Sequence, residues 1–258
     1  VSGVAGLPAL SARGDPQRMS DIIESRAAIL DATDVVKTFQ GGDGSVVTVL
    51  DGVTLRVARG EMVAIIGASG AGKSTLLHVL GALERPTAGI VRIGGDSVTA
   101  LSDEGLGALR NRHIGFVFQF HHLLKEFSAL ENVMMPMRIA DRPSGEVRSR
   151  AEGLLERVGL SHRLHHRPSE LSGGEQQRTA VARALAMSPA LLLADEPSGN
   201  LDHHNAESLH ALFGELASEL ALGLVVVTHN RSLAARAGRV LLLEAGRLSD
   251  TSGTMGAV

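Results

Sequence analysis

Short apolar runs separated by polar residues dominate the first part of the chain. They are rich in β-branched side chains, are divided by Gly and Asp turn signals, and occupy residues 34–39, 46–50 and 53–57. Such runs predict antiparallel strands. The next run, residues 62–66, is apolar throughout, which is typical of a strand buried on both faces. Residues 76–80 then predict a helix that stops at Gly81.

Helical periods fill the middle of the chain. Ser128 and Glu131 form a capping-box pattern that opens one predicted helix, and the apolar face of a second helix ends at Gly159. That face consists of Val147, Ala151, Leu154, Leu155 and Val158. Beyond it, strand-like and helix-like segments alternate. The predicted strands are 191–194, 224–227 and 240–243, and the predicted helices are 206–220 and 232–237.

This alternation defines the fold class. Strands that alternate with helices imply a parallel sheet covered on both faces. We therefore predict an α/β protein whose parallel-sheet core carries an N-terminal antiparallel β subdomain and an inserted all-helical subdomain at about residues 120–180. The expected domain spans residues 28–250, between a flexible N-terminal extension at 1–27 and a flexible tail at 251–258. Met19 precedes the ordered pattern, and an N-terminal peptide map of the native protein would test whether the protein starts there.

Composition narrows the class of protein. The chain has 258 residues, of which 44% are hydrophobic, and this is enough to bury a full core. No apolar run reaches the ~18–20 residues that a membrane-spanning helix needs. The absence of cysteine excludes disulfides and zinc–thiolate sites and fits a reducing cytosol. A net charge of -3 provides no overall basic footprint for nucleic acid.

A glycine-rich turn with the spacing G-x-x-x-x-G-K-[ST] lies between a predicted strand and a predicted helix. It consists of Gly67, Ala68, Ser69, Gly70, Ala71, Gly72, Lys73, Ser74 and Thr75. Glycines let several backbone N–H groups converge on phosphate oxygens, and the dipole of the following helix favours an anion. In such a loop Lys73 reaches the β- and γ-phosphates, and the Ser74 hydroxyl ligates Mg²⁺. The turn predicts a nucleoside triphosphate site in a P-loop NTPase core.

Two acids end the predicted strand at residues 191–194. Asp195 and Glu196 would face the crevice in which an α/β sheet binds its ligand. We expect Asp195 to hold Mg²⁺ through water, and Glu196 to orient or deprotonate the water that attacks the phosphate. The simpler alternative is a pair of solvated acids before Pro197, and the P-loop upstream favours the catalytic interpretation.

A second anion-binding helix start lies between the helical stretch and the acidic strand. It consists of Leu171, Ser172, Gly173, Gly174, Glu175, Gln176, Gln177 and Arg178. Ser172 is a capping residue, and two glycines expose backbone N–H groups at a helix end whose dipole favours phosphate. Kinases, GTPases and helicases share the P-loop and the acidic strand end, so this second element distinguishes the chain from them.

The letters L-S-G-G-E-Q resemble the signature motif of ABC ATPases, and the resemblance extends from about residue 29 to residue 248. It implies the RecA-like core of that family and a head-to-tail dimer of two copies. In such a dimer the P-loop of one copy and residues 172–174 of the other enclose each ATP. ATP binding would close the dimer and hydrolysis would release it. Glu175, next to the glycines, belongs to the same expected nucleotide contact.

Further positions match the family one by one. Gln119 resembles the glutamine that contacts Mg²⁺ and links the site to membrane subunits. His229 resembles the switch histidine that touches the γ-phosphate, and Asp202 ends a loop that resembles the one crossing the dimer interface. Phe39 stands where the family usually stacks a tyrosine on adenine, although core packing explains a phenylalanine equally well.

The segment from Gln119 to Asn132 is unusually apolar and aromatic for a connector, and such a surface favours a partner. It resembles the same stretch in the ATPases of bacterial lipoprotein-releasing systems, and MacB-type exporters and FtsE-like cell-division ATPases share much of it. The resemblance implies ATP-driven lipoprotein release toward a periplasmic carrier. The chain would be peripheral, on the cytoplasmic face of the inner membrane, with two integral membrane permease subunits contacted near residues 119–132.

Two other function classes fit the sequence less well. A non-transport ABC ATPase acting on nucleic acid usually carries a coiled-coil insertion, zinc-binding cysteines or a second ATPase unit, and none is visible here. A small-molecule kinase would leave the signature motif unexplained. Paired histidines, as at His121 and His122, do not complete a metal site, because adjacent side chains point apart and no suitable ligand spacing accompanies them.

Overall fold

The computed structural model describes residues 28–251. The expected N-terminal extension, 1–27, and all but the first residue of the expected tail, 251–258, lie outside the described residues. The strands are β1 Ala28–Gln40, β2 Val46–Ala58, β3 Met62–Ile66, β4 Ala88–Ile93, β5 Asp96–Ser97, β6 Ile114–Phe118, β7 Leu191–Asp195, β8 Gly223–Val227, β9 Arg239–Glu244 and β10 Arg247–Asp250. The α-helices are α2 Lys73–Leu80, α3 Asp103–His113, α4 Ala129–Ile139, α5 Ser144–Arg157, α6 Gly173–Ala184, α7 His203–Glu219 and α8 Arg231–Ala234.

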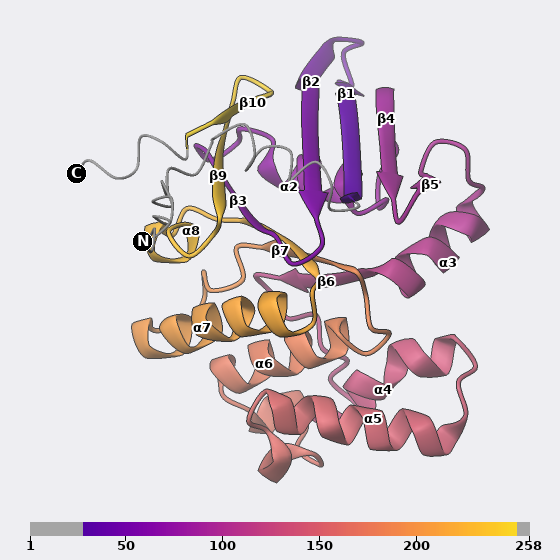
Figure 1. The fold of residues 1–258 in the computed structure, drawn as a ribbon, viewed down its shortest axis with the longest axis vertical. Helices are drawn as coiled ribbons and strands as arrows, with labels where there is room; N and C mark the ends of the chain where they lie inside the picture. Colours follow the sequence, from indigo (N-terminus) through magenta and orange to yellow (C-terminus); the bar gives the residue numbers. More distant parts are fainter. Residues whose placement is uncertain (1–27, 252–258) are drawn as a thin grey trace, which may run out of the picture.

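A sheet with the strand order β10-β9-β3-β8-β7-β6 forms the centre of the molecule (Figure 1). Its strands run parallel, except that β10 is antiparallel to β9. Alternate residues of one strand enter different cores: Leu191 and Leu193 pack toward the small sheet and α2, whereas Leu192 and Ala194 pack toward the helices. The sheet is therefore covered on both faces, which confirms the prediction from the βα alternation.

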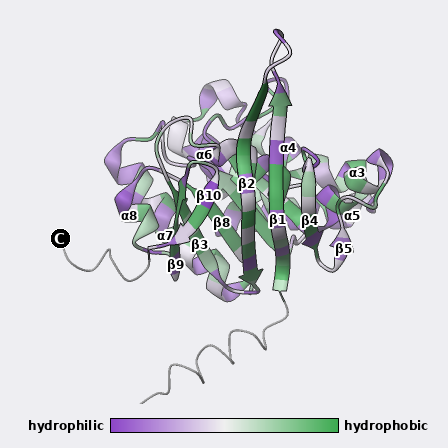
Figure 2. Ribbon diagram, turned by 90° about the horizontal axis from the view of Figure 1, so that it is seen from above, coloured by the Kyte–Doolittle hydropathy of each residue, from purple (hydrophilic) through white to green (hydrophobic). Residues whose placement is uncertain are grey.

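A smaller antiparallel sheet, ordered β2-β1-β4-β5, covers one face of the large sheet (Figure 2). The structure corrects one detail of the predicted strands. Residues 46–50 and 53–57 are not separate, because β2 continues through Asp51 and Gly52. Opposite them β1 advances two residues, from Val35 to Lys37, while β2 advances three. The extra residue is accommodated as a bulge, with Gly52 at φ 72°.

The predicted helical insertion is present between β6 and β7, and its main helices are α4, α5 and α6 (Figure 1). The capping box at Ser128 begins α4 as expected, and Val147, Ala151 and Leu155 form the buried face of α5. The helix expected at 232–237 is shorter, because α8 ends at Ala234. Within residues 28–251, no helix combines the length and hydrophobicity needed to span a membrane.

Candidate nucleotide-binding site

The P-loop joins β3 to α2 at the carboxyl edge of the large sheet. A Cβ on Gly67 would lie 2.4 Å from the Leu243 carbonyl oxygen, so the loop approaches β9 too closely for a side chain at that position. Gly72 is the N-cap of α2 at φ 94°, and no side chain caps this helix. Lys73 folds back, and its Nζ donates to the carbonyls of Gly67 at 3.0 Å and Ala68 at 2.9 Å. The helix start therefore leaves backbone donors available for an anion.

The structure brings most of the predicted site residues into one cavity of about 570 Å³. Its lining residues are Val49, Gly67, Ser69, Gly70, Gly72, Lys73, Ser74, Thr75, Gln119, Asp195, Glu196 and His229. They come from β2, the P-loop, α2 and the ends of β6, β7 and β8. Val49 also lines the cavity but was not predicted, because its place depends on β2 crossing over the P-loop.

Asp195 lies at the end of β7, beside the start of α2. Its carboxylate accepts a hydrogen bond from the Ser74 hydroxyl, and burial raises the pKa of Asp195 above its usual value. A bound cation would reverse that shift, because it favours the ionised carboxylate. The hydroxyl and the carboxylate are the oxygen donors that Mg²⁺ prefers, so the residues present fit the metal that the sequence implied.

Glu196 has an unusual backbone and a fully engaged carboxylate. Its φ is 44°, in the left-handed region that costs a non-glycine residue about 1–3 kcal/mol. Oε1 lies 2.9 Å from His229 Nδ1, and Oε2 accepts from Thr228 Oγ1 and from the His229 N–H, both at 3.2 Å. The two residues predicted to act on the γ-phosphate are thus in direct contact, and the strained backbone marks a position that its surroundings hold in place.

Gln119, after β6, is tied to the loop that follows Glu196. Its Nε2 donates to Asn200 Oδ1, and Asn200 Nδ2 donates back to the Gln119 carbonyl, both at 3.1 Å. A Cβ on Gly199 would lie 3.0 Å from Gln119 Nε2, so this contact depends on the missing side chain. The sequence placed Asn200 only in the loop that resembles the one crossing the dimer interface, and it did not reveal this pairing because Gln119 is far away along the chain.

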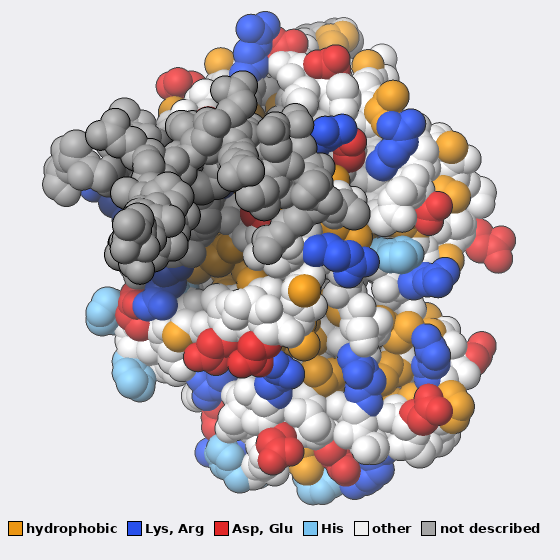
Figure 3. Space-filling model, in the orientation of Figure 1, with side chains coloured by type: hydrophobic (Ala, Val, Ile, Leu, Met, Phe, Trp, Pro, Cys, Tyr) orange, Lys and Arg blue, Asp and Glu red, His pale blue; other side chains and the backbone are white. Residues whose placement is uncertain are grey.

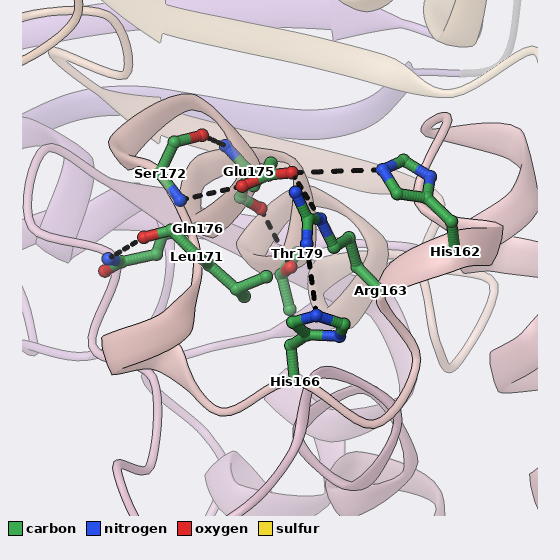
Figure 4. Close-up of polar contacts among 8 residues, drawn as sticks. All are labelled: His162, Arg163, His166, Leu171, Ser172, Glu175, Gln176 and Thr179. Carbon is green, nitrogen blue, oxygen red and sulfur yellow. Dashed lines mark hydrogen bonds and ion pairs between the residues drawn. The ribbon is translucent and has the colours of Figure 1, made fainter.

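The second predicted anion site is the N-terminus of α6 (Figure 4). Ser172 and Glu175 form a capping box: the Ser172 N–H donates to Glu175 Oε2 at 2.7 Å, and the Glu175 N–H donates to Ser172 Oγ at 3.3 Å. Arg163 Nε donates to the other carboxylate oxygen at 2.8 Å. These contacts, led by the Ser172 backbone, lower the pKa of Glu175 to about 2. Glu175 is thus an anchor for the turn, and Arg163 is a supporting residue that sequence reasoning missed.

The two glycines of this turn have different surroundings. Gly173 is exposed, as expected for a residue that offers its N–H to a ligand. Gly174 is buried, and a Cβ there would lie 2.4 Å from Asn205 Oδ1 on α7. Its missing side chain therefore permits packing against α7. Asp202 is the N-cap of the same helix and accepts from the Asn205 N–H at 3.0 Å.

Several predicted contacts lie outside the cavity lining within one copy of the chain. Neither residues 172–175 nor Asp202 contributes to the lining. Phe39 is also absent from it; the residue is 40% exposed, and Lys37 Nζ lies 4.9 Å from the centre of its ring. Adenine stacking on Phe39 and nucleotide contacts by α6 stay predictions.

A P-loop, an acidic strand end and a second capped helix start on an inserted helical lobe define the class of ATPase. The family described as ABC transporter matches residues 50–199. The chain belongs to the ABC transporter family, as a subunit that binds and hydrolyses ATP.

Its relatives give more detail. The chain is 52% identical to the lipoprotein-releasing system ATP-binding protein LolD of Geobacter metallireducens, over 86% of this chain and 98% of that protein. It is 52% identical to LolD of Pseudomonas syringae pv. tomato, over 88% and 99%. Among solved structures, it resembles a dimeric post-hydrolysis state of the cassette MJ0796 bound to ADP and Pi, with a TM-score of 0.79 and 37% identity over 87% and 99% of the two chains.

Proposed function

We propose that this chain is the ATPase that powers release of lipoproteins from the inner membrane toward a periplasmic carrier. The observation that carries the proposal is the 52% identity to LolD of Geobacter metallireducens over 98% of the relative's length. In this role the protein is peripheral, on the cytoplasmic face of the inner membrane. Its cargo is handled by membrane subunits, and its own chemistry is the hydrolysis of ATP.

Each residue of the cavity has a role in that chemistry. Backbone N–H groups of the P-loop and the Lys73 ammonium bind the phosphates, once Lys73 exchanges its carbonyl partners for phosphate oxygens. Ser74, Asp195 and Gln119 would hold Mg²⁺, which neutralises charge on the phosphates when bound. Glu196 orients and deprotonates the attacking water, and His229 keeps that carboxylate in place and approaches the γ-phosphate.

The site is completed by a second copy of the chain, turned head to tail. Support comes from the exposed Ser172 and Gly173 at the start of α6, which line no cavity of their own nucleotide site. Backbone donors that the capping box leaves free at this helix start are suited to a phosphate brought by another subunit. The cassette MJ0796 is a dimer in its solved structures, which supports the same arrangement here.

Two permease subunits would dock on the groove between the sheet and the helical lobe. Apolar side chains line the groove and its borders: Phe116, Phe118, Pro136 and Ile139 in the groove, and Phe120 beside it. Phe120 is 65% exposed and Ile139 is 69% exposed, which is unusual for large apolar residues. Figure 3 shows hydrophobic side chains in the hollow between the two halves of the molecule, with Lys and Arg side chains around it. A short amphipathic helix of a partner has this complementary character.

Reconstitution tests the cargo. The chain is incorporated with lipoprotein-release permeases into proteoliposomes that contain a labelled lipoprotein, and transfer to a soluble carrier is measured after ATP addition. We expect transfer with the wild-type chain and none with Glu196→Gln. ATP hydrolysis without transfer, together with stimulation by permeases of a MacB-type exporter or an FtsE-like complex, would reassign the chain to those systems. Salt-dependent DNA binding with no permease stimulation would favour the nucleic-acid class.

A further inference from the structure

A buried histidine on α7 lies between the two loops that carry Glu196 and His229. The side chain of His210 is fully buried, and no step of ATP hydrolysis uses it. Burial of a titratable ring in an otherwise apolar helix face costs solvation energy, so its polar partners have to compensate. Those partners connect the helix to both catalytic loops.

The first connection leads to the loop after Glu196. His210 Nε2 lies 2.9 Å from Ser198 Oγ, and the Ser198 residue is itself only 7% exposed. Ser198 belongs to a tight turn in which the Gly199 N–H donates to the Glu196 carbonyl at 3.0 Å. The turn holds Glu196 at its left-handed φ, so the hydrogen bond to His210 fastens this strained segment to the rigid helix behind it.

The second connection leads to the segment after His229. His210 Nδ1 lies 3.5 Å from Glu207 Oε1, one helical turn earlier on α7. The Glu207 carboxylate also accepts from Ser232 Oγ and, at 3.0 Å, from Arg236 NH2. Ser232 belongs to α8, which begins directly after His229 and Asn230. His210 and Glu207, on one face of α7, therefore contact both the loop after Glu196 and the segment after His229.

The environment selects one form of the ring. Burial lowers the pKa of His210, against the opposing effect of Glu207, while Arg236 and His203 add to the lowering. The neutral ring carries one N–H, and Nδ1 faces a carboxylate whereas Nε2 faces a hydroxyl that can donate. The consistent arrangement has Ser198 O–H donating to Nε2 and Nδ1–H on the side of the Glu207 carboxylate. Nδ1 approaches that carboxylate at 3.5 Å without forming a hydrogen bond to any described residue. Ser198 lines no part of the nucleotide cavity, so this Ser–His–Glu set positions residues and does not attack a substrate.

We propose that His210 is a positioning residue, which holds the turn from Glu196 to Gly199 in the geometry that hydrolysis requires and couples it through Glu207 to the segment after His229. The proposal rests on ATP hydrolysis by this chain and is independent of the transported cargo. Because His210 does not line the cavity, its loss should affect the chemical step more than ATP binding.

The test compares substitutions that keep or remove the contact to Ser198. His210→Gln places an amide near the Nε2 position, His210→Phe fills the space without polar atoms, and Ser198→Ala removes only the hydroxyl. Ser208→Ala is the matched control, since Ser208 is an exposed serine on the same helix. ATPase kcat and KM are measured on the full-length chain, and unfolding midpoints are measured in parallel.

We expect His210→Phe and Ser198→Ala each to lower kcat about tenfold, while the KM for ATP changes less than about twofold. The double variant His210→Phe/Ser198→Ala should have a kcat no lower than that of either single variant, because both changes remove the same contact. His210→Gln should keep kcat within about twofold of wild type, as should Ser208→Ala. Wild-type kcat in both Ser198→Ala and His210→Phe would overturn the proposal. Equal impairment of His210→Gln and His210→Phe, or a rise in KM alone, would also overturn it, because packing then explains the effect. If His210→Phe fails to fold, Ser198→Ala and the double variant Ser198→Ala/His210→Gln are compared instead. A similar loss of kcat in both supports the proposal, and wild-type kcat in both overturns it.

Discussion

Two helix N-termini in this molecule face anions in different ways. At α2 the N-cap is Gly72, no side chain caps the helix, and Lys73 rests on nearby carbonyls. At α6 the capping box between Ser172 and Glu175 already occupies two backbone donors, and Arg163 secures the capping carboxylate. The N-terminus of α2 is therefore uncapped, with free backbone donors, whereas the N-terminus of α6 is held in one conformation by its own side chains.

This difference indicates that the two helix N-termini have different functions in the dimer. An uncapped, glycine-rich helix start with the Lys73 ammonium beside it can bind a triphosphate within one subunit. A capped start has fewer free donors and a fixed shape, so it suits a contact added when a partner closes over a nucleotide already bound. We therefore expect changes at α2 to affect ATP binding, and changes at α6 to affect the partner's turnover.

The largest expected effect comes from blocking the chemistry while both helix starts stay intact. Glu196→Gln should lower turnover by at least ~10²–10³, the scale for loss of one preorganised transition-state contact, and should leave ATP binding in place. ATP should then accumulate between the α2 start of one copy and the α6 start of the other. Size-exclusion chromatography with ATP and magnesium should show a dimer. A variant that stays strictly monomeric, even with permeases, would contradict the idea that α2 of one copy and α6 of the other enclose the ATP.

Mixed dimers test which subunit the α6 start serves. Ser172→Arg should impair the site formed by the partner's Lys73 at least ~10-fold, because a bulky side chain blocks the approach to phosphate and the cap is lost. The measurement is ATPase activity of tagged heterodimers that carry Ser172→Arg and Lys73→Ala in the same copy or in different copies. If each site lies within one subunit, two changes in the same copy damage one site, and changes in different copies damage both. If the sites are composite, the opposite holds. Higher activity of the dimer with the changes in different copies therefore supports the head-to-tail arrangement, and higher activity of the same-copy dimer contradicts it.

A smaller effect is expected when the ion pair between Arg163 and Glu175 at the start of α6 is removed. Glu175→Gln keeps an acceptor for the Ser172 N–H but removes the charge that pairs with Arg163, and we expect about 1–2 kcal/mol less stability in urea unfolding. Glu131→Gln is the matched control, since Glu131 occupies the same place in the α4 capping box and forms no ion pair with an arginine within residues 28–251. An equal loss in both variants would show that the cap alone, and not Arg163, organises the helix start.

The pH dependence of that variant should be the smallest effect. The folded pKa of Glu175 is about 2, below the usual 4.5, so its ionised form stabilises the folded state. This contribution is fully present above about pH 5 and is lost as the pH falls from about 4.5 toward 2. The stability difference between wild type and Glu175→Gln should shrink over that range, as measured by urea unfolding at stepwise pH. A constant difference down to pH 3 would mean that the Glu175 charge does not matter.

The features that the sequence predicted best are those set by neighbouring residues. The P-loop follows from the spacing of Gly67, Gly72 and Lys73, because backbone curvature and helix direction are local properties. The Ser128 cap and the buried face of α5 follow from helical periodicity for the same reason. The parallel sheet followed from the order of strands and helices, since right-handed crossovers leave few alternatives.

The features that it missed depend on partners remote in sequence. Nothing near Arg163 shows that it reaches Glu175, and nothing near Asn200 shows its pairing with Gln119. The left-handed backbone of Glu196 is likewise invisible, because the surrounding turn and sheet impose it. The break expected within β2 was wrong because Asp51 and Gly52 resemble turn residues, while the pairing with β1 absorbs them as a bulge.

The attachment of the helical lobe has a mechanical consequence. The lobe leaves the sheet after Phe118, which pairs with Asp195 at the nucleotide edge, and returns before Leu191, which pairs with Ile114 at the opposite edge. At the returning end the Ala190 N–H donates to the His113 carbonyl at 3.1 Å, and the Ala190 carbonyl accepts from Gly223 at 2.9 Å. The lobe is therefore held by hydrogen bonds at Ala190, and its other end emerges beside Gln119 at the nucleotide cavity, so we expect a tilt of the lobe about Ala190 to displace Gln119.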